Sequence, residues 1–336
     1  MNLAQLLEEI KRMPRTAANI TAWKVLPAQP GRYAPFPPGL PPLLREALRQ
    51  KGIDSLYSHQ ARALEVALQR QHVAVVTPAA SGKTMCYNLP VLTSLLEDPE
   101  TRALYLFPTK ALAQDQLAEL HELVRLLDRD IRTYTYDGDT PTTARQAIRA
   151  SGHIVVTNPD MLHTGILPHH TKWLKLFSNL RYVVIDEMHN FRGVFGSHLA
   201  NVIRRLKRVC RFYGSQPCFI LCSATIANPS ELAERLIEEP VVLIEDNGAP
   251  RGEKHFIFYN PPLVNRELGI RRSSLLEGAS WARLLLANDV QTITFTRTRL
   301  SVEVLLRYMR EHSRNPRGVQ AYRGGYLPLE RRRIEQ

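Results

Sequence analysis

Short apolar runs recur along the middle of the chain, separated by amphipathic stretches. Such uninterrupted runs are typical of strands in a parallel sheet, because helices cover both faces of that sheet. They predict strands at residues 72–76, 103–107, 153–157, 182–185 and 219–222. The stretches between them place apolar residues at helical spacing, at 43–51, 60–69, 111–127, 142–150 and 197–213.

This alternation predicts an α/β fold, with a doubly wound parallel sheet covered by helices on both faces, from about residue 51 to 245. Residues 1–50 predict a short N-terminal helix followed by a strap. The strap, residues 27–42, is so rich in Pro and Gly that neither a regular helix nor a central strand can form there.

The last ninety residues predict a second α/β unit that is incomplete. Residues 246–285 are interpreted as a linker and the start of this unit, and residues 286–336 as part of a second domain. The pattern predicts a helix at 280–287, a strand at 291–295 and a helix at 299–312. Because one strand cannot close a sheet, we expect the chain to be C-terminally truncated.

Composition limits which class of binding partner and which cellular compartment are expected. Lys and Arg number 44 against 32 Asp and Glu, and the net charge of +12 favours a polyanionic partner without identifying one. The four cysteines form no C-x-x-C pair and show no zinc-ligand spacing, which indicates a reduced chain. The sequence predicts neither a signal peptide nor a membrane span, so we expect a cytoplasmic protein with no membrane partner.

The strand predicted at 72–76 runs directly into a candidate phosphate loop, which a helix follows. In such a loop the backbone N–H groups and the helix N-terminus hold the β-phosphate. Lys83 would reach the β- and γ-phosphates, and Thr84 would hold Mg²⁺ through its hydroxyl. Thr77 replaces the usual first glycine. The motif alone is therefore also compatible with an ordinary loop that binds no nucleotide. The candidate nucleotide-binding residues are Thr77, Ala80, Ser81, Gly82, Lys83 and Thr84.

Two acidic residues follow the strand predicted at 182–185. Ligands bind outside the carboxyl ends of strands in open α/β sheets, which is where Asp186 and Glu187 would lie. Asp186 can hold Mg²⁺ through water, and Glu187 can accept a proton from the water that attacks the γ-phosphate. A solvated acidic turn is the alternative, and the upstream phosphate loop disfavours it.

Ser223-Ala224-Thr225 follows a third predicted strand. Taken alone, these small hydroxylated residues are typical of a turn or a helix N-cap. Together with the phosphate loop and the acidic pair, they predict that Ser223 and Thr225 couple the nucleotide state to the second domain.

The order of these motifs resembles that of superfamily 2 DEAD/DEAH-box helicases, with Asp186-Glu187-Met188-His189 as a DExH motif. The resemblance implies RecA-like domains that bind and hydrolyse ATP with Mg²⁺. It also implies a glutamine motif at Tyr57 and Gln60, in which Gln60 reads the adenine edge. The implied catalytic residues are Lys83, Asp186, Glu187 and His189, the last coupling the nucleotide site to the second domain.

The same resemblance implies a track for nucleic acid. A helicase grips the backbone without reading sequence, through main-chain N–H groups, hydroxyls and cations. The residues expected on this track are Pro108, Thr109, Lys110, Gly138, Thr157, Asn158, Arg297, Arg323 and Gly324.

Residues 81–90, 186–215, 247–252 and 322–328 resemble the bacterial YprA/MrfA-type DNA-repair helicases more narrowly. This implies an ATPase that moves 3′ to 5′ on single-stranded or partly duplex DNA. Two alternatives stay open. One is an RNA helicase of the same superfamily. The other is a truncated ATP- and nucleic-acid-binding module without productive unwinding, because the chain ends before the motifs that supply second-domain arginines.

Overall fold

The computed structural model describes residues 2–311, 313, 315–327, 330 and 333–334, without the side chains of residues 110–112 and 115. It comprises two compact units, Gln29–Gly252 and the combination of Met1–Ala28 with Glu253–Gln336. This division differs from the segments expected from the sequence. The first 28 residues belong with the C-terminal part of the chain, because a strand formed there pairs with a strand that follows residue 253.

The larger unit is built on a seven-stranded sheet in the order β10-β4-β9-β8-β5-β7-β6, and every pairing in it is parallel. The doubly wound parallel sheet predicted from the sequence is therefore confirmed, and so are its five predicted strands. The two outermost strands, each three residues long, were not predicted. The strands are β4 (Val73–Val76), β5 (Arg102–Leu106), β6 (Thr133–Thr135), β7 (Ile154–Thr157), β8 (Leu180–Ile185), β9 (Cys218–Ser223) and β10 (Val242–Ile244).

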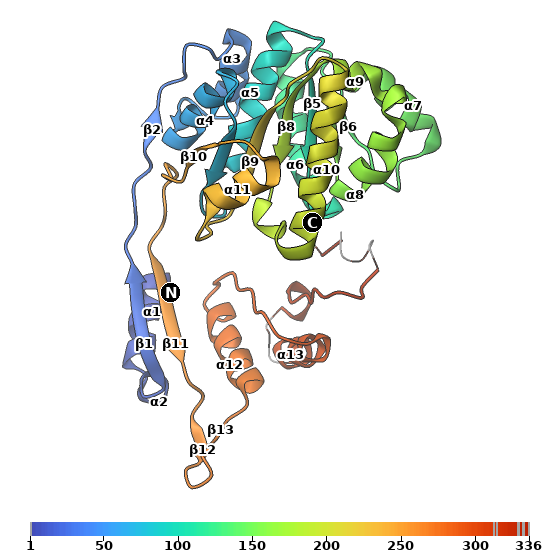
Figure 1. Cartoon of the computed structure of the whole chain (residues 1–336). Helices are drawn as coiled ribbons and strands as arrows, with labels where there is room; N and C mark the ends of the chain where they lie inside the picture. The colour runs from blue at the N-terminus through green and yellow to red at the C-terminus, as the bar shows by residue number, and fades with distance from the viewer. Residues whose placement is uncertain (1, 312, 314, 328–329, 331–332, 335–336) are drawn as a thin grey trace. The chain divides into compact units, whose positions relative to one another are not determined.

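Helices cover both faces of this sheet (Figure 1). One layer comprises α3 (Pro42–Gln50), α4 (Ser58–Leu68), α5 (Lys83–Glu97) and α6 (Lys110–Leu127). The other comprises α7 (Thr142–Ser151), α9 (Leu174–Ser178), α10 (Gly193–Phe212) and α11 (Pro229–Ile237). Shorter turns of helix are α8 (Pro159–Met161), a π-helix (Leu162–Ile166) and 3₁₀ segments at Leu167–Trp173 and Met188–Asn190.

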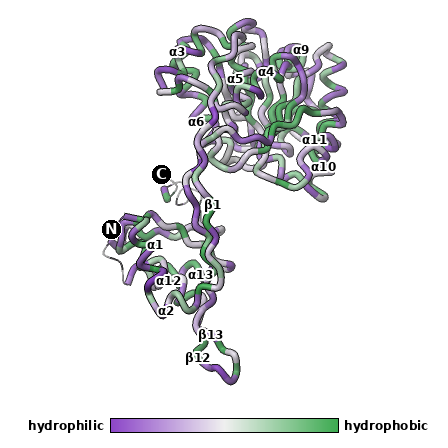
Figure 2. Tube along the Cα trace, turned by 90° about the vertical axis from the view of Figure 1, so that its left-hand side faces the viewer, coloured by the Kyte–Doolittle hydropathy of each residue, from purple (hydrophilic) through white to green (hydrophobic). Residues whose placement is uncertain are grey.

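Alternating residues of each strand pack into the two layers. In β8, Tyr182 and Val184 face the α3–α6 layer, whereas Val183 and Ile185 face the α7–α11 layer. All four are fully buried, which explains why the strands appear in the sequence as continuous apolar runs. Figure 2 shows the hydrophobic segments of the trace gathered in the interior of this unit.

The Pro-rich strap contains no helix before α3, as predicted. Within it, β2 (Tyr33–Ala34) pairs antiparallel with β3 (Leu56–Tyr57), directly before α4. This pairing fixes the strap beside the start of α4.

The smaller unit contains a two-stranded antiparallel ribbon of β1 (Ile20–Leu26) and β11 (Lys254–Tyr259), which was not predicted. Trp23 Nε1 donates to His255 Nδ1 (3.0 Å) across the ribbon. The remaining elements are α1 (Leu3–Arg12), α2 (Pro14–Ala17), β12 (Leu263–Asn265), β13 (Ile270–Arg271), α12 (Ser274–Leu286), α13 (Arg299–Glu311) and a 3₁₀ turn (Pro316–Gly318).

One predicted element of the smaller unit is wrong. Residues 291–295 form no strand, and Ile293 and Phe295 are 78% and 85% exposed. An isolated apolar run cannot become a strand without a neighbour to accept its backbone hydrogen bonds, and none pairs with it among the described residues. The predicted N-terminal helix and the helices at 280–287 and 299–312 are present as α1, α12 and α13.

Candidate nucleotide site

The carboxyl ends of five neighbouring strands form one row of loops. In the order β4-β9-β8-β5-β7, these ends carry the phosphate loop, Ser223, Asp186, Phe107 and Asn158. Parallel strands end at the same edge of a sheet, so motifs far apart in the sequence become neighbours here. The expected nucleotide residues occupy the β4-β9-β8 half of the row, and expected nucleic-acid residues follow β5 and β7.

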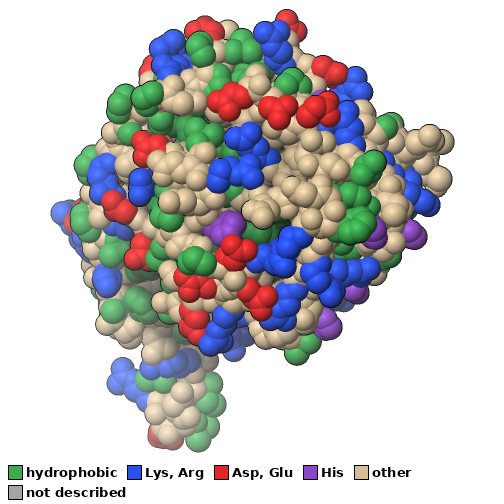
Figure 3. Space-filling view, turned by 45° about the horizontal axis from the view of Figure 1, so that its top comes forward, with side chains coloured by type: hydrophobic (Ala, Val, Ile, Leu, Met, Phe, Trp, Pro, Cys, Tyr) green, Lys and Arg blue, Asp and Glu red, His purple; other side chains and the backbone are tan. Residues whose placement is uncertain are grey.

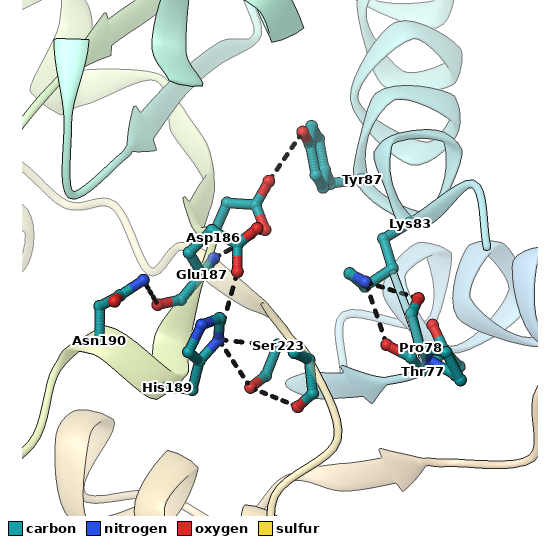
Figure 4. A network of polar contacts seen from close by, with 10 residues as sticks. Thr77, Pro78, Lys83, Tyr87, Asp186, Glu187, His189, Asn190 and Ser223 are labelled. Carbon is teal, nitrogen blue, oxygen red and sulfur yellow. Dashed lines mark hydrogen bonds and ion pairs between the residues drawn. The ribbon is translucent and has the colours of Figure 1, made fainter. Parts of the chain in front are cut away.

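The phosphate loop turns sharply between β4 and α5. Ala80 and Gly82 both have a positive φ, of 58° and 74°. This conformation is strained for a non-glycine residue, and such strain concentrates at functional loops. Lys83 Nζ donates to the carbonyl oxygens of Thr77 (3.0 Å) and Pro78 (2.9 Å), so the ammonium group lies over the loop (Figure 4). The Thr77 and Ser81 hydroxyls lie 2.6 Å apart and brace the loop from within.

The glutamine expected near the base is joined to this loop. Gln60 Oε1 accepts from the backbone N–H of Tyr57 (3.0 Å), and Gln60 Nε2 donates to the Gly82 carbonyl (2.9 Å). Both residues lie at the start of α4. The contact therefore connects the expected adenine end of the site with the expected phosphate end.

His59 is a further site residue that the sequence did not single out. The Gly248 N–H donates to His59 Nδ1 (3.1 Å), which leaves the proton on Nε2, and Nε2–H donates to the Ser81 carbonyl (3.0 Å). The ring is 1% exposed, and burial lowers the pKa of His59 below its usual value. A neutral imidazole thus joins residues 246–252 to the phosphate loop. Its partner lies 189 residues away, so no local signal could have identified it.

Asp186 lies at the end of β8 and is 7% exposed. Its Oδ1 accepts from the Glu187 N–H (2.7 Å), and its Oδ2 accepts from the Tyr87 hydroxyl (3.2 Å). Burial raises the pKa of Asp186 to about 6, and the bond from the Glu187 N–H opposes that shift. The carboxylate is therefore held in a fixed orientation at a position where negative charge is poorly solvated.

Glu187, His189 and Ser223 connect β8 to β9 (Figure 4). Glu187 has a φ of 52°, a left-handed conformation that is unfavourable for a residue with a Cβ. His189 Nδ1 lies 3.2 Å from Glu187 Oε2 and 3.5 Å from the Ser223 hydroxyl. The structure therefore brings the expected base, the expected coupling histidine and Ser223 together. Thr225 is exposed beyond them.

Thr84, the expected magnesium ligand of the loop, donates its hydroxyl proton to Gln116 Oε1 (2.5 Å). A hydroxyl with lone pairs and the Asp186 carboxylate are hard oxygen donors, the ligand type that Mg²⁺ prefers. The donor chemistry of these two residues therefore fits the ion. Within the described part of the chain, no three His, Cys, Asp or Glu side chains form an all-protein metal site.

The residues expected to contact nucleic acid in the larger unit differ in exposure. Thr109 and Gly138 are exposed, and Pro108 is half-buried. Asn158 Oδ1 caps α8 by accepting from the Met161 N–H (2.8 Å). Lys110 belongs to α6, but its side chain lies outside the part of the structure that is described.

Thr157 is placed differently from what a direct contact requires. It is 3% exposed, and its hydroxyl donates to the Tyr136 carbonyl (2.6 Å). Because that bond uses the only proton of the hydroxyl, Thr157 supports the loop that contains Gly138 instead of facing solvent. Local sequence could not reveal this, since the partner belongs to another strand end.

Three further residues of the expected track, Arg297, Arg323 and Gly324, lie in the smaller unit. Arg297 and Gly324 are exposed. Arg323 Nε donates to Glu303 Oε1 (2.6 Å), and its guanidinium lies 4.5 Å from the centre of the Tyr326 ring. The face shown in Figure 3 carries Lys and Arg side chains interspersed with Asp and Glu.

A parallel sheet covered on both faces, with a phosphate loop, a DExH acidic pair and a serine at adjoining strand ends, defines a RecA-like nucleotide-binding domain of the helicase type. Residues 57–232 match the sequence profile of the DEAD/DEAH box helicases. The chain belongs to the DEAD/DEAH box helicase family.

Similar proteins narrow the position within this family. The ATP-dependent helicase YprA of Bacillus subtilis (strain 168) is 53% identical over 338 residues, which cover 100% of this chain and 45% of YprA. A crystal structure of the DUF1998 helicase MrfA bound to DNA matches with a TM-score of 0.95 at 53% identity, covering 100% of this chain and 45% of MrfA.

A second MrfA structure, bound to DNA and AMPPNP, matches with a TM-score of 0.94 at 52% identity and covers 100% of this chain and 47% of that one. The chain therefore spans less than half the length of these relatives. Among its described residues, no helix combines the length and the apolar character needed to cross a membrane.

Proposed function

We propose that this chain forms part of an ATP-dependent DNA helicase that moves along single-stranded DNA and acts in DNA repair. The observation that carries the proposal is the row of strand ends in which the phosphate loop, Ser223 and Asp186 precede the loops after β5 and β7. The candidate ATP site and the expected nucleic-acid track would then share one sheet edge, so that a change at one could alter the other.

ATP would enter with its phosphates against the loop and its base toward Gln60. Lys83 is the cation nearest the loop carbonyls and would turn to the β- and γ-phosphates. Thr84 and Asp186 would hold Mg²⁺, which supplies positive charge to the phosphate oxygens. Glu187 would take the proton of the attacking water, and His189, whose Nδ1 lies near both Glu187 and Ser223, would couple the two.

DNA is proposed over RNA because the structures of MrfA, at 52–53% identity, are described as bound to DNA. The 3′-to-5′ direction and the repair role rest on the resemblance of residues 81–90, 186–215, 247–252 and 322–328 to YprA/MrfA-type helicases. A cytoplasmic location is proposed because all four cysteines are buried and unpaired.

The proposal is tested by ATP hydrolysis, measured for this chain and for a form extending beyond Gln336. Each is assayed without nucleic acid and with single-stranded DNA, duplex DNA or RNA. We expect single-stranded DNA to stimulate ATP hydrolysis most, because the proposed helicase moves along single strands. We expect this stimulation in the longer form, because the arginines that stabilise phosphoryl transfer come from the second domain in such enzymes. Stimulation by RNA instead would favour the RNA-helicase alternative, and no stimulation of the longer form would refute the helicase assignment.

The base is tested by Glu187→Gln in the longer form. The substitution keeps the size of the side chain and removes its ability to accept a proton, so we expect ATP binding to persist and turnover to fall by about 100-fold or more. Glu234→Gln, at an exposed position of α11, is the matched control and should hydrolyse ATP at the unaltered rate. Turnover retained by Glu187→Gln would remove Glu187 from the base role.

A further inference from the structure

Gln116 lies on α6, outside the motifs assigned above to ATP and Mg²⁺, yet its side chain contacts one expected magnesium ligand directly and the other through Tyr87. Its Oε1 accepts from the Thr84 hydroxyl (2.5 Å) and from the Tyr87 hydroxyl (3.0 Å). The Tyr87 hydroxyl also lies 3.2 Å from Asp186 Oδ2. Thr84 at the start of α5 is thus joined to Asp186 at the end of β8 through Gln116 and Tyr87.

The hydrogen bond from Thr84 to Gln116 determines which side of the Thr84 hydroxyl is available to a cation. A hydroxyl has one proton and two lone pairs. Because Gln116 accepts the proton, the lone pairs of Thr84 are directed away from the amide. A threonine held in this way can coordinate a cation without first breaking a hydrogen bond.

The hydrogen bond from the Tyr87 hydroxyl holds Asp186, the second expected oxygen ligand. Tyr87 is 1% exposed, and its hydroxyl has a single proton to donate to the groups around it. Its single proton faces two acceptors, Gln116 Oε1 and Asp186 Oδ2. The amide and the carboxylate therefore share one donor, and the orientation of Asp186 depends on Gln116.

We propose that Gln116 is a positioning residue for the divalent cation of the ATP site, acting on Thr84 directly and on Asp186 through Tyr87. The inference rests on the proposed function, because it concerns the cation that accompanies ATP. Partners of metal ligands that hold the ligand orientation typically affect metal affinity by about 10- to 100-fold. A purely structural Gln116 would instead tie α6 to α5 and leave the Mg²⁺ requirement unaltered.

The test measures binding of a fluorescent ATP analogue to the chain at increasing Mg²⁺, with a parallel titration in EDTA. Gln116→Leu keeps the approximate volume and removes the acceptor. We expect it to raise the Mg²⁺ concentration for half-maximal binding by about 10-fold or more, while affinity in EDTA stays at the wild-type value. Tyr87→Phe should raise the Mg²⁺ requirement in the same direction, because Asp186 loses its side-chain donor.

Two further variants distinguish positioning from packing. Gln116→Glu keeps an oxygen that accepts from Thr84, so its Mg²⁺ requirement should be at or below the wild-type value. His121→Leu alters an exposed position on the same helix and should leave the requirement unaltered.

The inference is overturned if Gln116→Leu keeps the wild-type Mg²⁺ requirement, or if Gln116→Glu is impaired as strongly as Gln116→Leu. If Gln116→Leu does not fold, Gln116→Ala, which removes the same acceptor, decides: a raised requirement supports the inference and an unaltered one overturns it. If the wild-type chain binds the analogue at no Mg²⁺ concentration, the proposed function fails as well. Mg²⁺-dependent binding by the wild type with no change in Gln116→Leu refutes the inference alone.

Discussion

Asp186 combines a low exposure with a proposed role that requires negative charge. Its carboxyl is 7% exposed, and burial raises its pKa from 3.8 to about 6. The folded state therefore binds a proton more readily than the unfolded state between these values. Above pH 6 the folded state holds a carboxylate at a free-energy cost of about 2 to 3 kcal/mol at most, and this cost disappears as the pH falls toward 4.

Asp186→Asn is accordingly expected to stabilise the metal-free protein while it removes a proposed magnesium ligand. The free energy of unfolding should rise by about 2 kcal/mol at pH 8, and the gain should shrink as the pH falls toward 4. Urea unfolding in EDTA across this pH range measures the difference. Asp54→Asn, at an exposed position, is the control and should change stability at neither pH. A variant equally stable or less stable than the wild type at pH 8 would contradict a cost of burial at this position.

The backbone of Glu187 is held in a strained conformation. Its left-handed φ of 52° is unfavourable for a residue with a Cβ, and neighbouring contacts hold it. Asn190 Nδ2 donates to the Glu187 carbonyl (3.2 Å), and the Asp186 carboxylate accepts from the Glu187 N–H. The two adjacent acids have different side-chain partners, Tyr87 for Asp186 and His189 for Glu187, which suits the two different roles proposed for them.

At the scale of elements, residues 246–252 are fastened to the start of α4. The Arg32 N–H donates to the Gly248 carbonyl (2.8 Å), and the Ser58 N–H donates to the Arg32 carbonyl (2.9 Å). Arg32 also forms an ion pair with Asp246. His59 continues this connection to the phosphate loop. A segment that the sequence presents as a linker is therefore part of the support for the nucleotide site.

Gly248→Ala tests how rigid this fastening is. An added Cβ would lie 2.7 Å from the Ser58 backbone nitrogen and 2.9 Å from the Arg32 carbonyl oxygen, and neither backbone atom can move freely. We expect a loss of about 1 to 3 kcal/mol in the free energy of unfolding, together with weaker binding of the ATP analogue. Urea denaturation and the binding titration measure the two effects.

Gly252→Ala is the matched control, because nothing lies within 4 Å of a Cβ built at Gly252. Its stability should stay within about 0.5 kcal/mol of the wild type. Equal losses in both variants would show that the segment yields to an added methyl and does not depend on the close contact at Gly248.

How far the sequence predicts an element depends on where its partners lie. The five long strands of the sheet could be predicted because burial on both faces makes them continuous apolar runs. The β1–β11 ribbon could not, because its pairing joins residues near 20 with residues near 259. The apolar run at 291–295 was misinterpreted for the same reason: hydrophobicity indicates burial, and only a neighbouring strand makes it a strand.

The candidate site follows the same rule. The phosphate loop and the acidic pair are local patterns, and the sequence places them correctly at strand ends. His59, Tyr87 and Gln116 were not identified as site residues, because each acts through a partner at least 29 residues away. These residues take part in the candidate site because the fold brings them close to their partners, and that proximity cannot be deduced from the sequence alone.

At the scale of the whole molecule, both large apolar clusters lie inside residues 29–252. A unit with its own covered sheet and complete phosphate loop has what it needs to fold alone. We expect residues 29–252, produced separately, to unfold cooperatively and to bind the ATP analogue within about 3-fold of the affinity of the whole chain. Circular dichroism and the same fluorescence titration measure this.

The two ends of that unit are themselves paired. The Gln29 N–H donates to the Arg251 carbonyl (2.8 Å), and the Arg251 N–H donates to the Gln29 carbonyl (2.9 Å). If residues 29–252 failed to fold when produced alone, the prediction would be wrong. That result would show that the two bonds between Gln29 and Arg251 form only when the β1–β11 ribbon is present.

The paired ends also impose an order of assembly. In an unfolded chain, bringing β1 to β11 closes a loop of roughly 230 residues at an entropic cost of about 5 kcal/mol. Once residues 29–252 have folded, Gln29 and Arg251 are hydrogen-bonded, and only a few residues separate each of them from the ribbon. The ribbon is therefore inexpensive to form late and costly to form early. During synthesis β1 can pair with β11 only after residue 253 has been passed, and the lower entropic cost favours pairing after residues 29–252 have folded.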